Sequence, residues 1–294
     1  MTDAGSKPYI WMLCGSFSFT IMAELAYGLT RECDWTIVAI ARSAFAASFA
    51  ALLAMLLGAK LVFLRPLRLW IRSTAGSCSM LCTFYAFAKL PTVDVLTLTN
   101  TFPLWVALLS WPLYGKIPNG RVWLAVAAGV VGVALIEQPH LEAGNAGAIA
   151  ALGAAFFTAI AMLGLHSLSE IDPLAVVVHF SLVATVFCIG AALVVPRSFE
   201  PLHIESGFVW LKLFGLGLSA TIGQVFLTLA FGSGSPAKVS VVGLTQIVFV
   251  FGYDVAFRDH GVNTVAVVGT VLVLAPTAWL LLHSGVTKEP RAGE

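Results

Sequence analysis

Polar side chains recur inside long apolar stretches of this chain, and these are the residues whose chemistry needs explaining. Thr99 and Asn100 stand shortly before Pro103 in an otherwise apolar segment. Because proline removes a backbone hydrogen bond, it should leave a carbonyl near Thr99 unbonded. Such a carbonyl is tolerated at membrane depth where it lines a protein cavity. We therefore predict that Thr99 and Asn100 line a ligand cavity, with hydrogen bonding between helices as the alternative.

Two glutamines, Gln224 and Gln246, are the most polar side chains deep in the apolar segments of the second half. A side-chain amide presents both donors and acceptors, which suits a zwitterionic ligand. Either glutamine could instead bond a neighbouring helix. We predict that both line a binding site, and the structural alternative stays open.

Ionisable side chains inside apolar segments form a third group of candidates, and they include Glu24, Arg42 and His179. Glu24 and Arg42 could pair across a helical hairpin, which would make them structural. A lone buried histidine is more often a satisfied core residue, but histidine titrates near neutral pH and could relay protons. We place His179 among the candidate binding residues beside these alternatives.

Aromatic side chains also fall in the middle of the apolar segments. Each could contact lipid or pack in a core, whereas an aromatic-lined cavity would suit apolar, aromatic or cationic ligands. The aromatic candidates for such a cavity are Phe17, Tyr85, Trp105 and Phe157.

The elements that must position these residues are membrane-spanning helices. The chain is 59% hydrophobic and 11% charged, whereas a soluble domain carries about 25% charged residues. A bilayer core is crossed by about 20 apolar residues of helix. We predict an all-α polytopic membrane protein of ten helices, at Tyr9–Leu29, Trp35–Gly58, Trp70–Leu90, Val93–Tyr114, Arg121–Ile136, Asn145–Leu168, Pro173–Val195, Gly207–Phe231, Pro236–Phe257 and Val262–His283.

Short segments recur along the chain at a nearly constant offset of about 140 residues. Asp34-Trp35 and Asp172-Pro173 open the second and seventh predicted helices, and Phe84–Ala88 parallels Phe226–Ala230. We predict two five-helix repeats, at residues 1–140 and 141–294. Because five is odd, the second repeat must enter the membrane from the opposite side, and inverted repeats are typical of secondary transporters.

The positions of lysine and arginine predict the orientation of the chain. Basic residues near helix ends favour the cytoplasmic side. This rule predicts that both termini are cytoplasmic and that the protein lies in the inner membrane. The first-half residues counted as cytoplasmic loop charges are Lys7, Lys60, Arg65, Arg68, Arg72, Lys116 and Arg121, against Arg31 and Lys89 outside.

The chain resembles the EamA-type members of the drug/metabolite transporter superfamily along nearly its whole length. It departs from them at Gly115-Lys116, where such proteins often have Gly-Glu, and near Thr245-Gln246, which lacks a counterpart of Pro103. Within the superfamily it looks most like the YddG-type exporters of aromatic amino acids. The residues that carry the resemblance are Arg42, Ala88-Lys89-Leu90-Pro91, Pro103 and the Gly129–Gly132 stretch.

This resemblance implies a secondary transporter that exports small metabolites by alternating access around a central cavity. Amino acids, aromatic ones especially, are the expected cargo, and other metabolites or cationic drugs are the alternative. A channel or an intramembrane enzyme is the alternative from another class. We expect a monomer in the lipid bilayer.

Motifs for other functions are missing from the sequence. It has no Gly-x-x-x-x-Gly-Lys-Ser/Thr phosphate loop, no His-Glu-x-x-His and no Gly-x-Ser-x-Gly. Cys78 and Cys82 share a helix face, but no histidine or carboxylate joins them as a metal set would require. We therefore predict no catalytic residue, no metal, no cofactor and no nucleic-acid partner, and so no enzyme.

Overall fold

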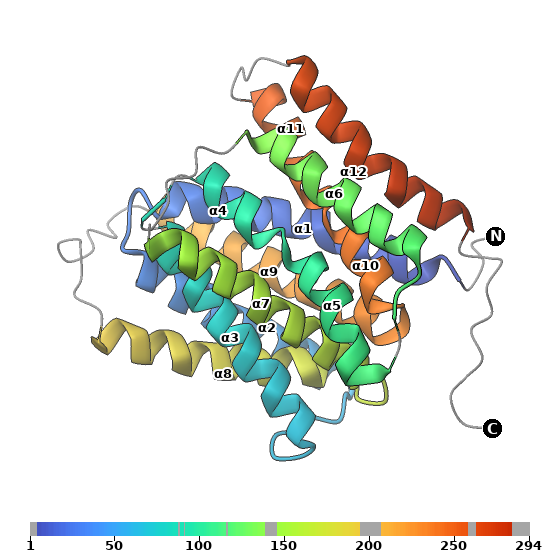
Figure 1. Ribbon diagram of the computed structural model, residues 1–294. Coiled ribbons are helices and arrows are strands. Elements are labelled where there is room, and N and C mark those ends of the chain that lie inside the picture. Colours follow the sequence, from blue (N-terminus) through green and yellow to red (C-terminus); the bar gives the residue numbers. More distant parts are fainter. Residues whose placement is uncertain are drawn as a thin grey trace, which may run out of the picture.

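The structure is a bundle of helices (Figure 1). The computed structural model describes residues 5–87, 89–90, 92–115, 117–138, 146–194, 207–257 and 263–283. Within these ranges every regular element is an α-helix. The helices are α1 Lys7–Leu29, α2 Trp35–Leu57, α3 Leu67–Phe87, α4 Thr92–Thr99, α5 Phe102–Tyr114, α6 Gly120–Glu137, α7 Ala146–His166, α8 Pro173–Val194, α9 Gly207–Ser233, α10 Pro236–Gly243, α11 Thr245–Phe257 and α12 Thr264–His283.

Eight candidate membrane spans are long and apolar enough to cross a bilayer, which confirms an all-helical membrane protein. Six of them are α1, α2, α6, α7, α8 and α9, the seventh joins α10 to α11, and the eighth is α12. Two predicted spans are not among the eight. One is α3, which carries Arg68, Arg72 and a row of hydroxyl side chains, and the other is interrupted between α4 and α5. The count of ten spans therefore stays a prediction.

Most helix ends follow from local sequence signals. The Asp34 side chain accepts a hydrogen bond from the backbone N–H of Thr36 at 2.9 Å, which caps the start of α2. Gly58 and Gly115 follow α2 and α5 with φ of 67° and 65°, a left-handed conformation that glycine adopts without strain. The start of α3 differs from the prediction: the helix begins at Leu67, three residues before the predicted Trp70.

The fourth predicted helix and the ninth are both interrupted in the middle. The first break separates α4 from α5 at residues 100–101, just before Pro103, where one continuous helix was predicted; proline cannot donate a backbone hydrogen bond, and the helix stops in front of it. The second separates α10 from α11 at Leu244, although no proline stands there. At this second break, the hydroxyls of Ser16 and Thr20 on α1 donate to the carbonyls of Gly243 and Gln246, at 3.4 and 3.3 Å. Ser16 of α1 therefore satisfies a carbonyl where α10 stops, whereas the Thr20 hydroxyl divides its one hydrogen between Gln246 and the Ser16 carbonyl of its own helix, at 3.0 Å.

The strongest packing joins helices that are distant in the sequence. Helix α1 packs against α9, α3 against α7, α2 against α8, and α6 against α12. In Figure 1, α6 and α12 run side by side along one edge of the bundle. Gly132 and Gly269 bring these two helices together, because a Cβ atom on either would approach the other's carbonyl oxygen to 2.7 or 2.6 Å.

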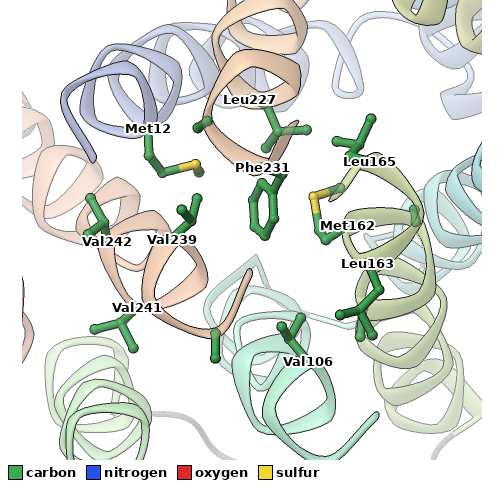
Figure 2. Packing of buried hydrophobic residues seen from close by; sticks show 14 of the residues in the cluster. Met12, Val106, Met162, Leu163, Leu165, Leu227, Phe231, Val239, Val241 and Val242 are labelled. Carbon is green, nitrogen blue, oxygen red and sulfur yellow. The ribbon is translucent and has the colours of Figure 1, made fainter. Parts of the chain in front are cut away.

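One end of the bundle is filled by an apolar plug (Figure 2). Its residues come from the first part of α1, from α5 and α10, and from the ends of α7 and α9, and the fully buried ring of Phe231 lies among them. Close packing of such side chains leaves no passage for a polar solute. The plug residues labelled in Figure 2 are Met12, Val106, Met162, Leu163, Leu165, Leu227, Phe231, Val239, Val241 and Val242.

Candidate functional site

A buried arginine lies at the centre of the candidate binding site. Arg72, on α3, is only 1% exposed. Its Nη2 donates a hydrogen bond to Oε1 of Gln224 on α9, at 2.9 Å. Its Nε and Nη1 are buried and have no hydrogen-bond partner among the described residues. This arrangement is unusual, because buried polar groups are nearly always hydrogen-bonded.

A second arginine faces the same aromatic ring as the first. The Cζ atoms of Arg72 and Arg42 lie 4.0 and 6.0 Å from the ring centroid of Phe180, on α8. Arg42, on α2, donates from Nη1 to the Sδ of Met80 at 2.8 Å. We call Arg42, Arg72, Phe180 and Gln224 the arginine cluster. Four helices, α2, α3, α8 and α9, contribute one residue each.

Two glycines make room for Arg72, one beside its guanidinium and one beside the base of its side chain. A Cβ atom at Gly76 would lie 2.8 Å from the Phe180 ring and 2.9 Å from Nη1 of Arg72. A Cβ atom at Gly164, on α7, would lie 3.0 Å from the Cβ atom of Arg72. The arginine is therefore held between its own helix, α7 and α8, and its side chain extends towards α9.

His179 neighbours Phe180 on α8 and ties this helix to α3. Its Nδ1 lies 2.8 Å from the hydroxyl of Ser73. Its Nε2 lies 3.1 Å from the carbonyl oxygen of Phe63, which can only accept. Trp70 packs edge-on against the imidazole with ring centroids 4.7 Å apart. Since both ring nitrogens are hydrogen-bonded, the geometry favours the satisfied core histidine over the proton relay.

Of the predicted site residues, the structure brings Gln224 and His179 to the arginine cluster or its border. Thr99 and Asn100, at the end of α4, instead bond carbonyls of their own helix. The Thr99 hydroxyl donates to Val95 at 2.8 Å, and the Asn100 amide donates to Leu96 at 2.8 Å. Tyr85 lies half-buried on α3.

The remaining predicted residues lie in two other places. Trp105 on α5 packs edge-on against Phe156 of α7 at 5.4 Å between centroids, and Phe156 in turn contacts Phe157 at 5.8 Å. Phe17 on α1 is 55% exposed and packs edge-on against Phe249 of α11 at 5.7 Å. Gln246 lies on the same helix as Phe249, where its backbone carbonyl accepts from Thr20.

The sequence prediction for Arg72 was wrong. It was counted as a cytoplasmic loop charge, because α3 was expected to begin at Trp70 and leave it at the helix end. Helix α3 begins at Leu67, so Arg72 lies inside the helix and is buried. The signal available in the sequence was Gly76, which follows Arg72 after one helical turn on the same face.

A cavity of about 440 Å³ opens near the loop between α2 and α3. Lys60, Glu170 and Asp172 are among the residues that line it. Asp172 accepts a hydrogen bond from the backbone N–H of Leu174 at 2.8 Å, so its side chain already caps the start of α8. Glu170 is exposed, and neither Arg42 nor Arg72 lines this cavity.

The EamA-like transporter family matches the chain twice, at residues 6–138 and 145–282. The chain therefore belongs to this family, as the sequence predicted. The pseudopaline exporter CntI of Pseudomonas aeruginosa is 28% identical over 265 residues, which cover 88% of this chain and 90% of that protein. An uncharacterized transporter of Helicobacter pylori is 25% identical over 214 residues, 70% of each chain.

Two further proteins are more distantly similar to this chain. Solute carrier family 35 member G1 of Homo sapiens is 23% identical over 221 residues, 70% of this chain and 59% of that protein. One crystal structure superposes with a TM-score of 0.77 at 14% identity, covering 95% of this chain and 96% of the other. At that identity the likeness concerns the fold alone.

The comparisons establish the class of the protein. It is a multi-pass membrane transporter and not an enzyme, as predicted. The relatives above are an exporter of pseudopaline and transporters whose names state no aromatic cargo. Export of aromatic amino acids therefore stays a prediction.

Proposed function

We propose that this transporter exports small amino-acid-like metabolites across the cytoplasmic membrane by alternating access. The observation that carries this proposal is the hydrogen bond from Arg72 to Gln224. It links a helix of the first half to a helix of the second through buried polar side chains, which inside a membrane protein are costly and usually functional. The likeness to the pseudopaline exporter over most of both chains supports the direction of transport.

An inverted repeat, at residues 1–140 and 141–294, is part of the proposal. Helix α1 packs on α9 as α7 packs on α3, and α2 packs on α9 as α8 packs on α3. Helices α2 and α8 pack on each other, as do α6 and α12. These reciprocal pairs are what a pseudo-two-fold axis relating two five-helix halves would produce. The two family matches, one in each half, support the same division. Its boundary, at residues 140 and 141, falls outside the described residues.

Ten membrane crossings follow if α4 joins α5 and α10 joins α11 across their breaks. With both termini in the cytoplasm, the apolar plug then lies at the cytoplasmic end, because α1 begins there and Met12 lies near its start. Alternating access would require the plug to part when the site opens towards the cytoplasm. The C-terminal residues 284–294 lie outside the described residues, and the orientation rests on the positive charges of the sequence.

Exchange transport in proteoliposomes tests this function. Liposomes containing the purified full chain are loaded with an unlabelled amino acid and supplied with the labelled one, for a panel that includes Phe, Trp and Met. We expect saturable exchange that empty liposomes lack. Uptake that rises linearly with concentration would indicate a channel instead of alternating access. No exchange of any amino acid would show that amino acids are not the transported solutes.

A pH gradient across the same liposomes tests the role of His179. Because both its ring nitrogens are hydrogen-bonded, we expect exchange to be insensitive to the gradient. A gradient-driven accumulation that His179→Gln abolishes would instead make this histidine a proton carrier.

A further inference from the structure

The guanidinium of Arg72 keeps buried donors that no described residue uses. The contacts of Arg72 and Arg42 run to an amide oxygen, a thioether and an aromatic ring, none of which carries a negative charge. A buried cation without an anionic partner is strongly destabilising. Natural proteins keep such a group where a function needs it.

We propose that Arg72 binds a carboxylate group of the transported solute. This inference rests on the proposed transport function and names the substrate class for the same site. A guanidinium presents five N–H donors in a planar fork that matches a carboxylate. Gln224 accepts one hydrogen of Nη2, so the second hydrogen of Nη2, with Nε or Nη1 beside it, still completes a two-pronged fork.

The surroundings of the fork select for organic acids and against cations. Arg42 adds a second positive charge on the same aromatic ring, which strengthens attraction for an anion. Phe180 and Met80 offer apolar surface beside the charge, which suits a solute with an apolar or aromatic body. Cationic drugs are therefore poor ligands for this site.

Gln224 also couples binding of the solute to the conformational change. Its hydrogen bond to Arg72 is a contact between the two proposed halves, and an incoming carboxylate must share or displace it. Binding of the solute would therefore weaken a contact that holds α3 to α9. Because a ligand shifts a conformational equilibrium only through contacts that differ between the states, this exchange of partners couples binding to opening.

The way to the site passes the apolar plug. Leu69 stands one turn before Arg72 on α3 and belongs to the same buried cluster as the plug residues. Phe231 stands two turns beyond Gln224 on α9. A solute from that end therefore reaches Arg72 only after the plug parts.

A matched pair of probes tests the carboxylate site without requiring transport. The two probes, 3-phenylpropionate and 3-phenylpropanamide, have the same shape and differ in the charged group. We would measure the thermal unfolding midpoint of the purified full chain in detergent over a concentration series of each. The acid should raise the midpoint saturably. The amide should need a concentration at least about tenfold higher to give the same rise.

Three variants identify Arg72 as the responsible group. R72Q should lose the preference for the acid, while R68Q, an exposed arginine on the same helix, should keep it. Q224E supplies its own carboxylate to Arg72, and it should fold at least as stably as the wild type yet lose the response to the acid. The unfolding midpoint of Q224E without ligand, at or above that of the wild type, separates a loss of response from misfolding.

The outcomes separate this inference from the proposed function. Equal effects of acid and amide, no effect of either, or an acid preference retained in R72Q and Q224E would overturn the carboxylate site, whatever the exchange assay gives. An acid preference that depends on Arg72, combined with no exchange of any amino acid in proteoliposomes, would keep the carboxylate site and overturn the proposal that amino acids are the exported solutes.

Discussion

The arginine cluster and the apolar plug lie close together, and helix α9 carries residues of both, but one is polar and charged and the other is apolar. On α3, Leu69 belongs to the plug's cluster and Arg72 to the arginine cluster, one turn apart. On α9, Phe231 belongs to the plug and Gln224 belongs to the arginine cluster. The cluster uses few contacts with fixed directions, whereas the plug uses many contacts without direction (Figure 2).

This difference assigns the two regions to different tasks. Directed hydrogen bonds discriminate among solutes, because a mismatched partner leaves a buried donor unsatisfied. Apolar packing excludes water from any polar path and can re-form after each opening without a specific partner. Variants in the plug should therefore change closure and stability, and variants in the cluster should change solute preference.

The largest effect is expected in the plug, for Phe231→Ala. The ring is fully buried, and its removal leaves a cavity that should lower the free energy of unfolding by about 3 kcal/mol or more. Thermal unfolding in detergent measures the loss. Phe208→Ala, at an exposed position on the same helix, is the control. Equal stability of the two variants would show that the plug carries little packing energy.

Gly76→Ala tests the cluster without changing any charge. The new methyl group would press on both Phe180 and Arg72, and we expect the acid probe to bind about tenfold more weakly, since overpacking costs about 1–3 kcal/mol. Titration of the unfolding midpoint with the acid measures this change. Gly153→Ala on α7 meets no neighbour within 4 Å and should bind the acid normally. Normal binding by both variants would contradict the position assigned to the guanidinium.

Arg42→Gln tests how much each of the two arginines in the cluster contributes to binding of the acid. Arg42 acts at longer range than Arg72, so its loss should weaken binding of the acid by about fivefold and leave some preference for the acid over the amide. The same titration measures both quantities. A complete loss of preference would make Arg42, rather than Arg72, the group that holds the carboxylate.

The smallest effect is expected for Tyr114→Phe, at the edge of the plug. The Tyr114 hydroxyl donates to the carbonyl of Leu163 at 2.6 Å and joins α5 to α7. Its removal should cost about 1 kcal/mol of stability and leave the acid preference unchanged. A change in preference would break the separation between the two regions.

Much of the helical framework was predictable because its signals are local. Long apolar segments and caps such as Asp34 predict α1 and α2 closely, and Pro103 marks the place where the fourth predicted helix is interrupted, although a break was not predicted there. The break between α10 and α11 has no such signal. At this break the carbonyl of Gly243 accepts from the Ser16 hydroxyl of α1, a contact that only the folded bundle creates.

The site was predictable only in part, for the same reason. Gln224 stands out as a polar side chain in an apolar segment, and the sequence predicts it as a binding residue. Its partner Arg72 was mistaken for a loop charge, because an arginine near a helix end usually reaches water. What buries it are Gly76, Phe180 and Gly164, which three different helices bring together.

The most direct test of the account is competition in the exchange assay. The labelled solute is whichever member of the amino-acid panel exchanges best, and the competitors are carboxylic acids and their matching amides. The account predicts that each acid competes at least about tenfold better than its amide in the wild type and in R68Q. That preference should disappear in R72Q. Amides that compete as well as acids in the wild type would contradict the claim that transported solutes are held by a carboxylate on Arg72.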